Sequence, residues 1–181
     1  MDMLKSAVLM EILVDKNPGN NDGWTPLHYA GYNGHAKVCS LIMAELEDKN
    51  PRNNNGVTPF HMAAQNDNVD VCSLIMGSLE DKNPVSNDGL TPLHYSASHG
   101  HAKVCSLIME VLVNKNPGNN NGTTPLHLAA FRGRLEICKL IWYNAENKNP
   151  IDNLGRTPLS NAIENGHLEV VSFFEEANNL N

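Results

Sequence analysis

Histidine and cysteine, the side chains most often used for metal ligation and nucleophilic catalysis, recur along this 181-residue chain at a constant interval of 33 residues. The positions are His28, His61, His94 and His127, and Cys39, Cys72, Cys105 and Cys138. A zinc site needs ligands that converge within about 2.0–2.3 Å of one ion, whereas side chains displaced by a whole repeat cannot converge. A Cys–His nucleophilic pair needs a third orienting group, which this pattern does not supply. We therefore expect no catalytic, metal or cofactor site, and interpret the recurring residues as structural.

Composition limits the compartment and the classes of partner. The net charge of −7 disfavours nucleic acids and anionic membrane surfaces, because both are bound through Lys and Arg. No apolar run approaches the about 18 residues of a membrane span, and the start of the chain lacks the regions of a signal peptide. Four cysteines at repeat spacing fit reduced, buried thiols. We expect a protein of the cytoplasm, or alternatively the nucleus, that binds neither nucleic acid nor membrane.

The histidines belong to a repeated stretch, which reads Asp-Gly-Trp-Thr-Pro-Leu-His at 22–28. Its Gly-x-Thr-Pro core returns four more times, with the threonines at 25, 58, 91, 124 and 157. Asp-Gly favours a tight turn, Thr25 is a good helix N-cap, and Pro26 suits the first helical position. A short first helix should follow and end at Asn33 and Gly34, since Gly readily takes the left-handed cap conformation.

A second helix is predicted over residues 35–46. Val38, Leu41, Ile42 and Leu46 recur at helical spacing and should form its buried stripe. The sequence Asp-Lys-Asn-Pro at 48–51 breaks the pattern, because proline cannot continue a helix. Each repeat is therefore expected to hold two antiparallel helices, joined to the next repeat by a turn.

This combination closely resembles the ankyrin repeat, whose period is also about 33 residues. Thr-Pro-Leu-His is intact at 25–28, 91–94 and 124–127, and it reads Thr-Pro-Phe-His at 58–61 and Thr-Pro-Leu-Ser at 157–160. The resemblance covers residues 20–181 directly. It implies an all-α fold, a curved α-solenoid of stacked helix-turn-helix repeats with short β-hairpin-like loops between them. It also implies that the motif histidine is structural, bonding near its threonine and to the backbone of the adjoining repeat.

Residues 1–181 are expected to form a single ankyrin repeat domain. Its parts are a partial repeat at 1–19, repeats at 20–52, 53–85, 86–118 and 119–151, and a C-terminal capping repeat at 152–181. The partial repeat corresponds to a second helix, which either covers the edge of the array or is the remnant of a longer one. We expect the second repeat and the two ends to open first, because stability in such arrays is local.

Two departures from the ankyrin pattern bear on local structure. In the second repeat Asp67 replaces the helix-ending glycine, and Gly77 lies inside the second helix, where it costs about 1 kcal/mol relative to Ala. In addition, ankyrin repeats commonly place a glycine after the second helix. Here that position holds Leu46, Leu79, Leu112 and Ala145. The helix therefore either runs longer or ends by another route at Asp-Lys-Asn-Pro.

Positions that the repeat pattern does not fix are the candidates for specific binding. In ankyrin proteins, hairpin and first-helix positions line the concave groove that meets a protein partner. Trp, Tyr, Met and Arg are also enriched at protein interfaces. The predicted protein-binding residues are Trp24, Tyr29, Tyr32, Met62, Gln65, Leu90, Tyr95, Ser98, His99, Phe131, Arg132 and Arg156.

The leading hypothesis is a monomeric, non-enzymatic scaffold that binds a protein partner through this surface. The alternative is a structural or regulatory fragment of a longer ankyrin-containing chain with no groove ligand of its own. In that case Tyr29, Tyr95 and Leu128 are packing residues. A further hypothesis is a modification substrate, because some ankyrin repeats are hydroxylated at an Asn near the hairpin. The residues near that place are Asn50, Asn83, Asn116 and Asn149.

Overall fold

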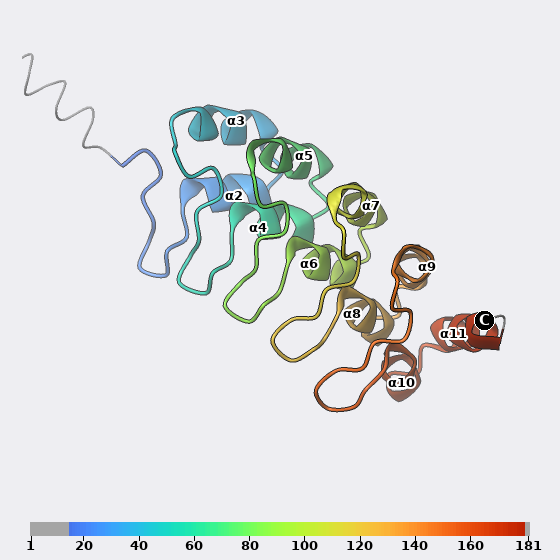
Figure 1. The fold of residues 1–181 in the computed structure, drawn as a ribbon. Coiled ribbons are helices and arrows are strands. Elements are labelled where there is room, and N and C mark those ends of the chain that lie inside the picture. Colours follow the sequence, from blue (N-terminus) through green and yellow to red (C-terminus); the bar gives the residue numbers. More distant parts are fainter. Residues whose placement is uncertain (1–14, 180–181) are drawn as a thin grey trace, which may run out of the picture.

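The computed structural model describes residues 15–179, and within them the chain is all-helical (Figure 1). The first helices of five successive pairs are α2 (Pro26–Tyr32), α4 (Pro59–Gln65), α6 (Pro92–His99), α8 (Pro125–Phe131) and α10 (Pro158–Glu164). The second helices are α3 (Ala36–Ala44), α5 (Val69–Ser78), α7 (Ala102–Val111), α9 (Leu135–Asn144) and α11 (Leu168–Asn179). None of these helices has the length and apolar character needed to cross a membrane.

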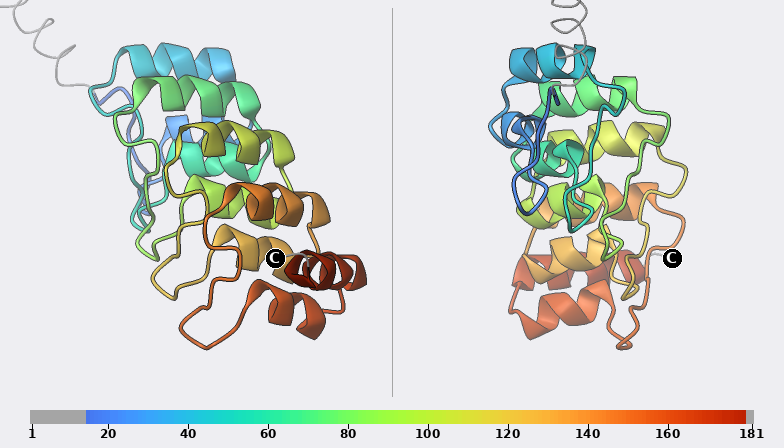
Figure 2. Two further views of the ribbon diagram at one scale, coloured as in Figure 1. Left: turned by 45° about the vertical axis from the view of Figure 1, so that its right-hand side comes forward. Right: turned by 90° about the vertical axis from the view of Figure 1, so that its left-hand side faces the viewer.

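The helices form two layers, and the loops between successive pairs project to one side (Figures 1 and 2). Each first helix packs against its own second helix, and successive first helices pack against one another. Successive second helices also contact one another, and the buried side chains form one continuous core. Because each pair of helices contacts its neighbours in the row, the architecture is that of a solenoid. The predicted all-α solenoid is confirmed.

Local sequence explains where each first helix begins. Thr25 has extended backbone angles (φ −105°, ψ 162°), and Pro26 is the first helical residue. The same Thr–Pro step begins α4, α6, α8 and α10. Proline suits this position because the N–H it lacks would have no partner within the helix. The predicted N-cap and first helical residue are therefore confirmed in all five repeats.

The first helices end beside residues with left-handed backbone angles. Gly34 has a φ of 72°, and Gly100 has a φ of 86°. In the second repeat Asp67 takes this place with a φ of 56°, and within residues 15–179 it is the only non-glycine with a positive φ. The predicted glycine cap is confirmed, and Asp67 adopts a conformation that costs a side-chain-bearing residue about 1–2 kcal/mol.

A row of asparagines, one in each loop, joins the loops between repeats by hydrogen bonds. Asn54 Nδ2 donates to the carbonyl oxygen of Asn21 (3.0 Å), and Asn87 Nδ2 donates to that of Asn54 (2.9 Å). The row continues through Asn120 and Asn153. The backbone N–H of each of these asparagines also donates to a carbonyl of the preceding loop. The loops thus resemble hairpins, although residues 15–179 contain no assigned strand.

The buried stripe predicted for the second helix of the first repeat is wrong at two positions. Val38 is 45% exposed and Leu41 is 65% exposed. The equivalents of Val38 in later repeats, Val71 and Val104, are fully buried, and so is Val170 in the last pair. Since Val170 is buried with no described helix after it, this position faces the preceding repeat. Val38 is exposed because, among the described residues, no second helix of an earlier repeat lies beside α3.

A lysine ends the second helices in place of the glycine that the ankyrin resemblance implies. Lys49 Nζ donates to the carbonyl oxygens of Met43 and Leu46 at the end of α3. Its equivalents, which cap the helices of the next three repeats, are Lys82, Lys115 and Lys148. The ammonium group satisfies carbonyls that have no partner within the helix, and its charge suits the negative end of the helix dipole. The helix therefore ends through Asp-Lys-Asn-Pro.

Candidate protein-binding surface

The motif histidines join neighbouring repeats. His28 Nδ1 lies 3.1 Å from the Thr25 backbone nitrogen and 2.9 Å from Thr25 Oγ1, and His28 Nε2 lies 3.0 Å from the Val57 carbonyl oxygen. His61, His94 and His127 repeat this arrangement one repeat further on each time. A backbone N–H only donates and a carbonyl only accepts, so the ring must be neutral with its hydrogen on Nε2.

Burial reinforces this neutral state. Desolvation lowers the pKa of His61 and of His94 to about 4, and it lowers the pKa of His28 and His127 in the same direction. Both ring nitrogens are occupied by hydrogen bonds, so these histidines have no free atom for a substrate or a metal. The structural role implied by the ankyrin resemblance is confirmed.

The cysteines are buried and unpaired, as expected. Burial raises the pKa of Cys72, Cys105 and Cys138 to about 12, so these thiols stay protonated and weakly nucleophilic at neutral pH. Within residues 15–179, no three His, Cys, Asp or Glu side chains lie close enough together to hold a metal ion. The recurring histidines therefore serve inter-repeat hydrogen bonding, and the recurring cysteines are part of the buried core.

The most distinctive feature of the surface is an aromatic cluster at the first repeat. Trp24 packs edge-on against His28, with 5.3 Å between ring centroids, and its centroid lies 6.4 Å from that of Tyr29. Tyr29 is 53% exposed and Tyr32 is 44% exposed. Together they border a hollow of about 330 Å³, here named the Trp24 hollow, whose lining residues are Trp24, His28, Tyr29, Tyr32, Asn33 and Met62.

Met62 comes from the second repeat and is only 7% exposed. It contributes to the lining of the hollow, so three predicted residues from one repeat meet a fourth from the next. The resemblance to ankyrin repeats predicts that these residues share one face. The space that they enclose depends on how closely α2 and α4 pack, which no local sequence pattern reveals.

The central candidates are more deeply packed. Tyr95 lies edge-on to His61, with 5.2 Å between ring centroids, and is partly buried, which raises its pKa. Leu90 is also partly buried. The carbonyl oxygens of Gln65 and Ser98 accept hydrogen bonds from side chains of the next repeat. These residues therefore serve packing as well as any surface role.

Four further candidates lie in the third, fourth and last repeats. Phe131 is exposed, and the Arg132 guanidinium lies 5.6 Å from the centre of its ring. Arg156 is held by Asp152 through an ion pair of 2.7 Å. His99 is exposed and stacks on His101, with ring centroids 5.9 Å apart. The structure does not gather these residues with the Trp24 hollow into one continuous patch.

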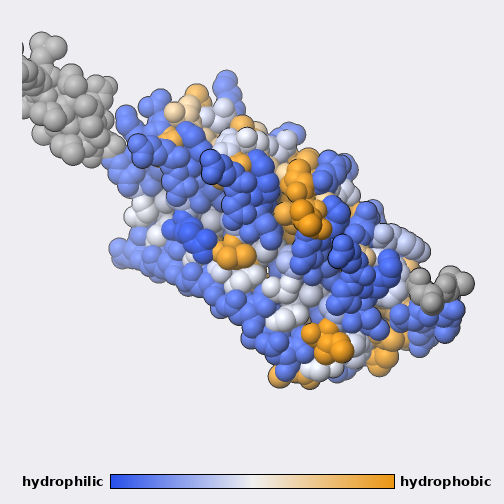
Figure 3. Space-filling model, in the orientation of Figure 1, coloured by the Kyte–Doolittle hydropathy of each residue, from blue (hydrophilic) through white to orange (hydrophobic). Residues whose placement is uncertain are grey.

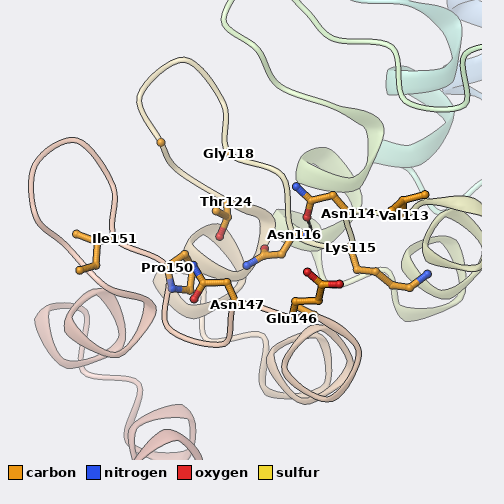
Figure 4. A pocket seen from close by; sticks show the side chains of 12 residues that line it. Val113, Asn114, Lys115, Asn116, Gly118, Thr124, Glu146, Asn147, Pro150 and Ile151 are labelled. Carbon is orange, nitrogen blue, oxygen red and sulfur yellow. Dashed lines mark hydrogen bonds between the residues drawn. The ribbon is translucent and has the colours of Figure 1, made fainter.

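The surface seen in Figure 3 is mostly hydrophilic, with small, separate hydrophobic patches. A larger hollow of about 470 Å³ lies between the loops that follow α7 and α9 (Figure 4). Its lining holds one carboxylate, Glu146, and one ammonium group, that of Lys115, which already caps α7. The amides of Asn114, Asn116 and Asn147 also line it (Figure 4).

Two sets of inter-repeat hydrogen bonds were not predicted from the sequence, although the residues that form them recur at multiples of 33 residues. Side chains at one position donate to the end of the preceding first helix, and they are Asn68, His101, Arg134 and His167. Amide oxygens at another position accept the N–H of the second residue of a first helix, and they belong to Asn17, Asn50 and Asn116. Two of the asparagines considered for modification are thus buried structural residues.

Comparison with known proteins agrees with this geometry. A family model described as ankyrin repeats, in three copies, matches residues 3–83, 36–115, 74–152 and 108–181. A search among curated proteins finds no match. Ankyrin repeats are in general protein–protein interaction modules. The matched residues span almost the whole sequence, and the chain therefore belongs to the ankyrin repeat family.

Proposed function

We propose that this chain is a non-enzymatic scaffold that binds a protein partner through the face made by its hairpin loops and first helices. The observation that carries the proposal is the Trp24 hollow, where two half-exposed tyrosines and a tryptophan surround an apolar space. Aromatic side chains left exposed in a cluster forgo hydrophobic burial, and such clusters mark interaction sites. Trp and Tyr are also the residue types that dominate binding energy at interfaces.

The chemistry of the recurring His and Cys also supports a binding role. The motif histidines beneath it are neutral and fully bonded, and the cysteines are buried protonated thiols. The residues between these fixed positions differ from one repeat to the next along the face. Recognition of a partner by shape and apolar contact fits this arrangement better than catalysis does.

Affinity capture followed by mass spectrometry tests the proposal. The wild-type chain should retain a defined partner. A triple variant should reduce this retention at least tenfold, because hot-spot aromatic residues each contribute substantially to affinity. The triple variant combines Trp24→Ala, Tyr32→Ala and Phe131→Ala. The matched control is Tyr143→Ala, which removes an aromatic that is 70% exposed on the second-helix layer. Full retention by the triple variant, with its melting temperature unchanged, would sink the proposal.

A second candidate is a structural segment of a longer ankyrin array. One observation favours it: Val38 is exposed on α3 although its equivalents Val71 and Val104 are buried, and Leu41 exposes further apolar surface on the same helix. Leu41→Asp would spoil that surface without touching the Trp24 hollow. Loss of capture with Leu41→Asp, together with full capture by the triple variant, would favour this second function.

A further inference from the structure

The Trp24 hollow also indicates the chemical class of its guest. Building on the proposed function, we propose that the hollow accepts one uncharged, apolar side chain from a peptide segment of the partner protein. The guest is an aliphatic or aromatic side chain, and the peptide backbone on either side of it lies along the rim.

The size and polarity of the hollow fit such a guest. A volume of about 330 Å³ lies at the lower end of the range of about 300–1,000 Å³ typical of ligand sites, so it suits a side chain better than a whole cofactor. Three aromatic rings and the Met62 side chain make up most of the lining. Met62 is buried between the repeats, so the thioether closes the hollow from the side of α4.

The charges around the hollow argue against a charged guest. Its six lining residues include no carboxylate and no permanently charged cation. His28 is neutral, with both ring nitrogens hydrogen-bonded, and the Asn33 side-chain amide donates to the Tyr29 carbonyl oxygen (2.8 Å). A charged group entering the hollow would lose hydration without gaining an ion pair, which is costly. The main competitor is an organic cation held by the faces of the aromatic rings.

The rim supplies hydrogen-bonding groups for a peptide backbone. Trp24 Nε1 and the hydroxyl groups of Tyr29 and Tyr32 form no hydrogen bond with any residue of the described range 15–179. An indole N–H donates, and a phenol both donates and accepts, so the three groups can bind the carbonyl and N–H groups beside the guest. Edge-on packing of Trp24 on buried His28 holds the indole in place before binding, which lowers the entropic cost.

Proton NMR of the two indole N–H groups provides a direct test, since the chain has two tryptophans. Trp24 borders the hollow, and Trp142 is buried against α11 and serves as an internal reference. The probes are N-acetyl-leucinamide, N-acetyl-phenylalaninamide, N-acetyl-glycinamide and tetramethylammonium chloride. We expect saturable shifts of the Trp24 signal with the first two probes, in the millimolar range expected of such small ligands, and no saturable shift with the last two.

Two variants locate the effect. Tyr32→Ala should weaken binding of N-acetyl-leucinamide at least fivefold, whereas Phe131→Ala, at the other end of the array, should leave it unchanged. Saturable binding of tetramethylammonium without binding of the apolar amides would overturn the assigned guest. The absence of any saturable shift at the Trp24 signal would overturn the hollow as a binding site.

These outcomes are separate from failure of the proposed function. Affinity capture that depends on Phe131 but not on Trp24 and Tyr32 would overturn the inference about the hollow and leave the protein-binding function standing. Capture that survives all three substitutions would instead overturn the proposed function itself. The NMR titration and the capture experiment therefore fail independently.

Discussion

Each motif histidine links two repeats while remaining uncharged, and this has a consequence for pH dependence. The ordinary histidine pKa of 6.5 falls to about 4 for His61 and for His94 in the folded chain. Between these pH values the unfolded chain binds protons that the folded chain does not, so stability falls as the pH falls. Each of the two should remove about 2 kcal/mol from the free energy of unfolding between pH 7 and pH 5. Urea denaturation at the two pH values measures the change.

The last repeat provides a natural control for this prediction. Ser160 occupies the histidine position there, and its Oγ accepts the Thr157 N–H (2.9 Å). His94→Ser should therefore keep the helix cap but lose the bond to the Thr123 carbonyl oxygen (3.0 Å). We expect a loss of about 1–3 kcal/mol at pH 7 and a smaller pH slope. An unchanged slope would show that His94 does not titrate as described.

The lysine caps lead to a prediction at the scale of single elements. Lys115 Nζ donates to the carbonyl oxygen of Leu112 (2.8 Å) and to that of Met109 at the end of α7. Lys115→Met keeps the apolar stem but leaves both carbonyls without this donor. The free energy of unfolding should fall by about 1–2 kcal/mol in urea denaturation. Lys103 is an exposed lysine in the first turn of the same helix, so Lys103→Met should have little effect on the free energy of unfolding.

The second repeat contains two positions where a substitution should stabilise the chain. Asp67 has a positive φ, and a Cβ added at Gly77 within α5 would meet no atom within 4 Å. Asp67→Gly should relieve backbone strain, and Gly77→Ala should raise helix propensity, each by about 1 kcal/mol. Thermal denaturation measures both. Gly34→Ala is the opposite control, because its Cβ would lie 2.5 Å from Asn68 Oδ1, so it should lower the melting temperature.

At the scale of the whole molecule, the last repeat differs where inner repeats face their successors. Met43, Met76 and Met109 are buried at the position where the last repeat carries exposed Glu175. Ile163 is exposed at a position where the preceding repeats carry Gly or Ala. Space at this position is small inside the array, because a Cβ added to the equivalent Gly31 would lie 2.9 Å from the Pro59 carbonyl oxygen. A charged and a bulky residue at these positions support the capping role predicted for residues 152–181, which stays a prediction.

The linear arrangement also predicts how the molecule opens. Inner repeats contact a neighbour on both sides, whereas α2 and α11 pack against described repeats on one side only. Amide hydrogen exchange should therefore be fastest in α2 and α11, faster in α5 than in α7, and slowest in α6 and α7. Uniform protection from α2 to α11 would contradict this local opening. It would indicate that the described repeats unfold as one unit.

The sequence by itself determined the repeat period and the helix starts, because these depend on local chemistry, namely the Thr cap, the Pro at the first helical position and the left-handed glycine. The fold class and the structural role of the motif histidines followed from the resemblance to ankyrin repeats that this repeated pattern carries. Trp24, Tyr29 and Tyr32 could likewise be placed together, because they lie within about two helical turns of one another.

Only the tertiary structure decided what neighbouring repeats do to each other. Val38 is exposed and Val71 is buried although both are valines at the same repeat position, because the outcome depends on whether a helix covers them. The Trp24 hollow exists because Met62, from the next repeat, closes it. The lysine caps and the asparagine row require three-dimensional packing as well, since a repeated residue type does not reveal which carbonyl its side chain will meet.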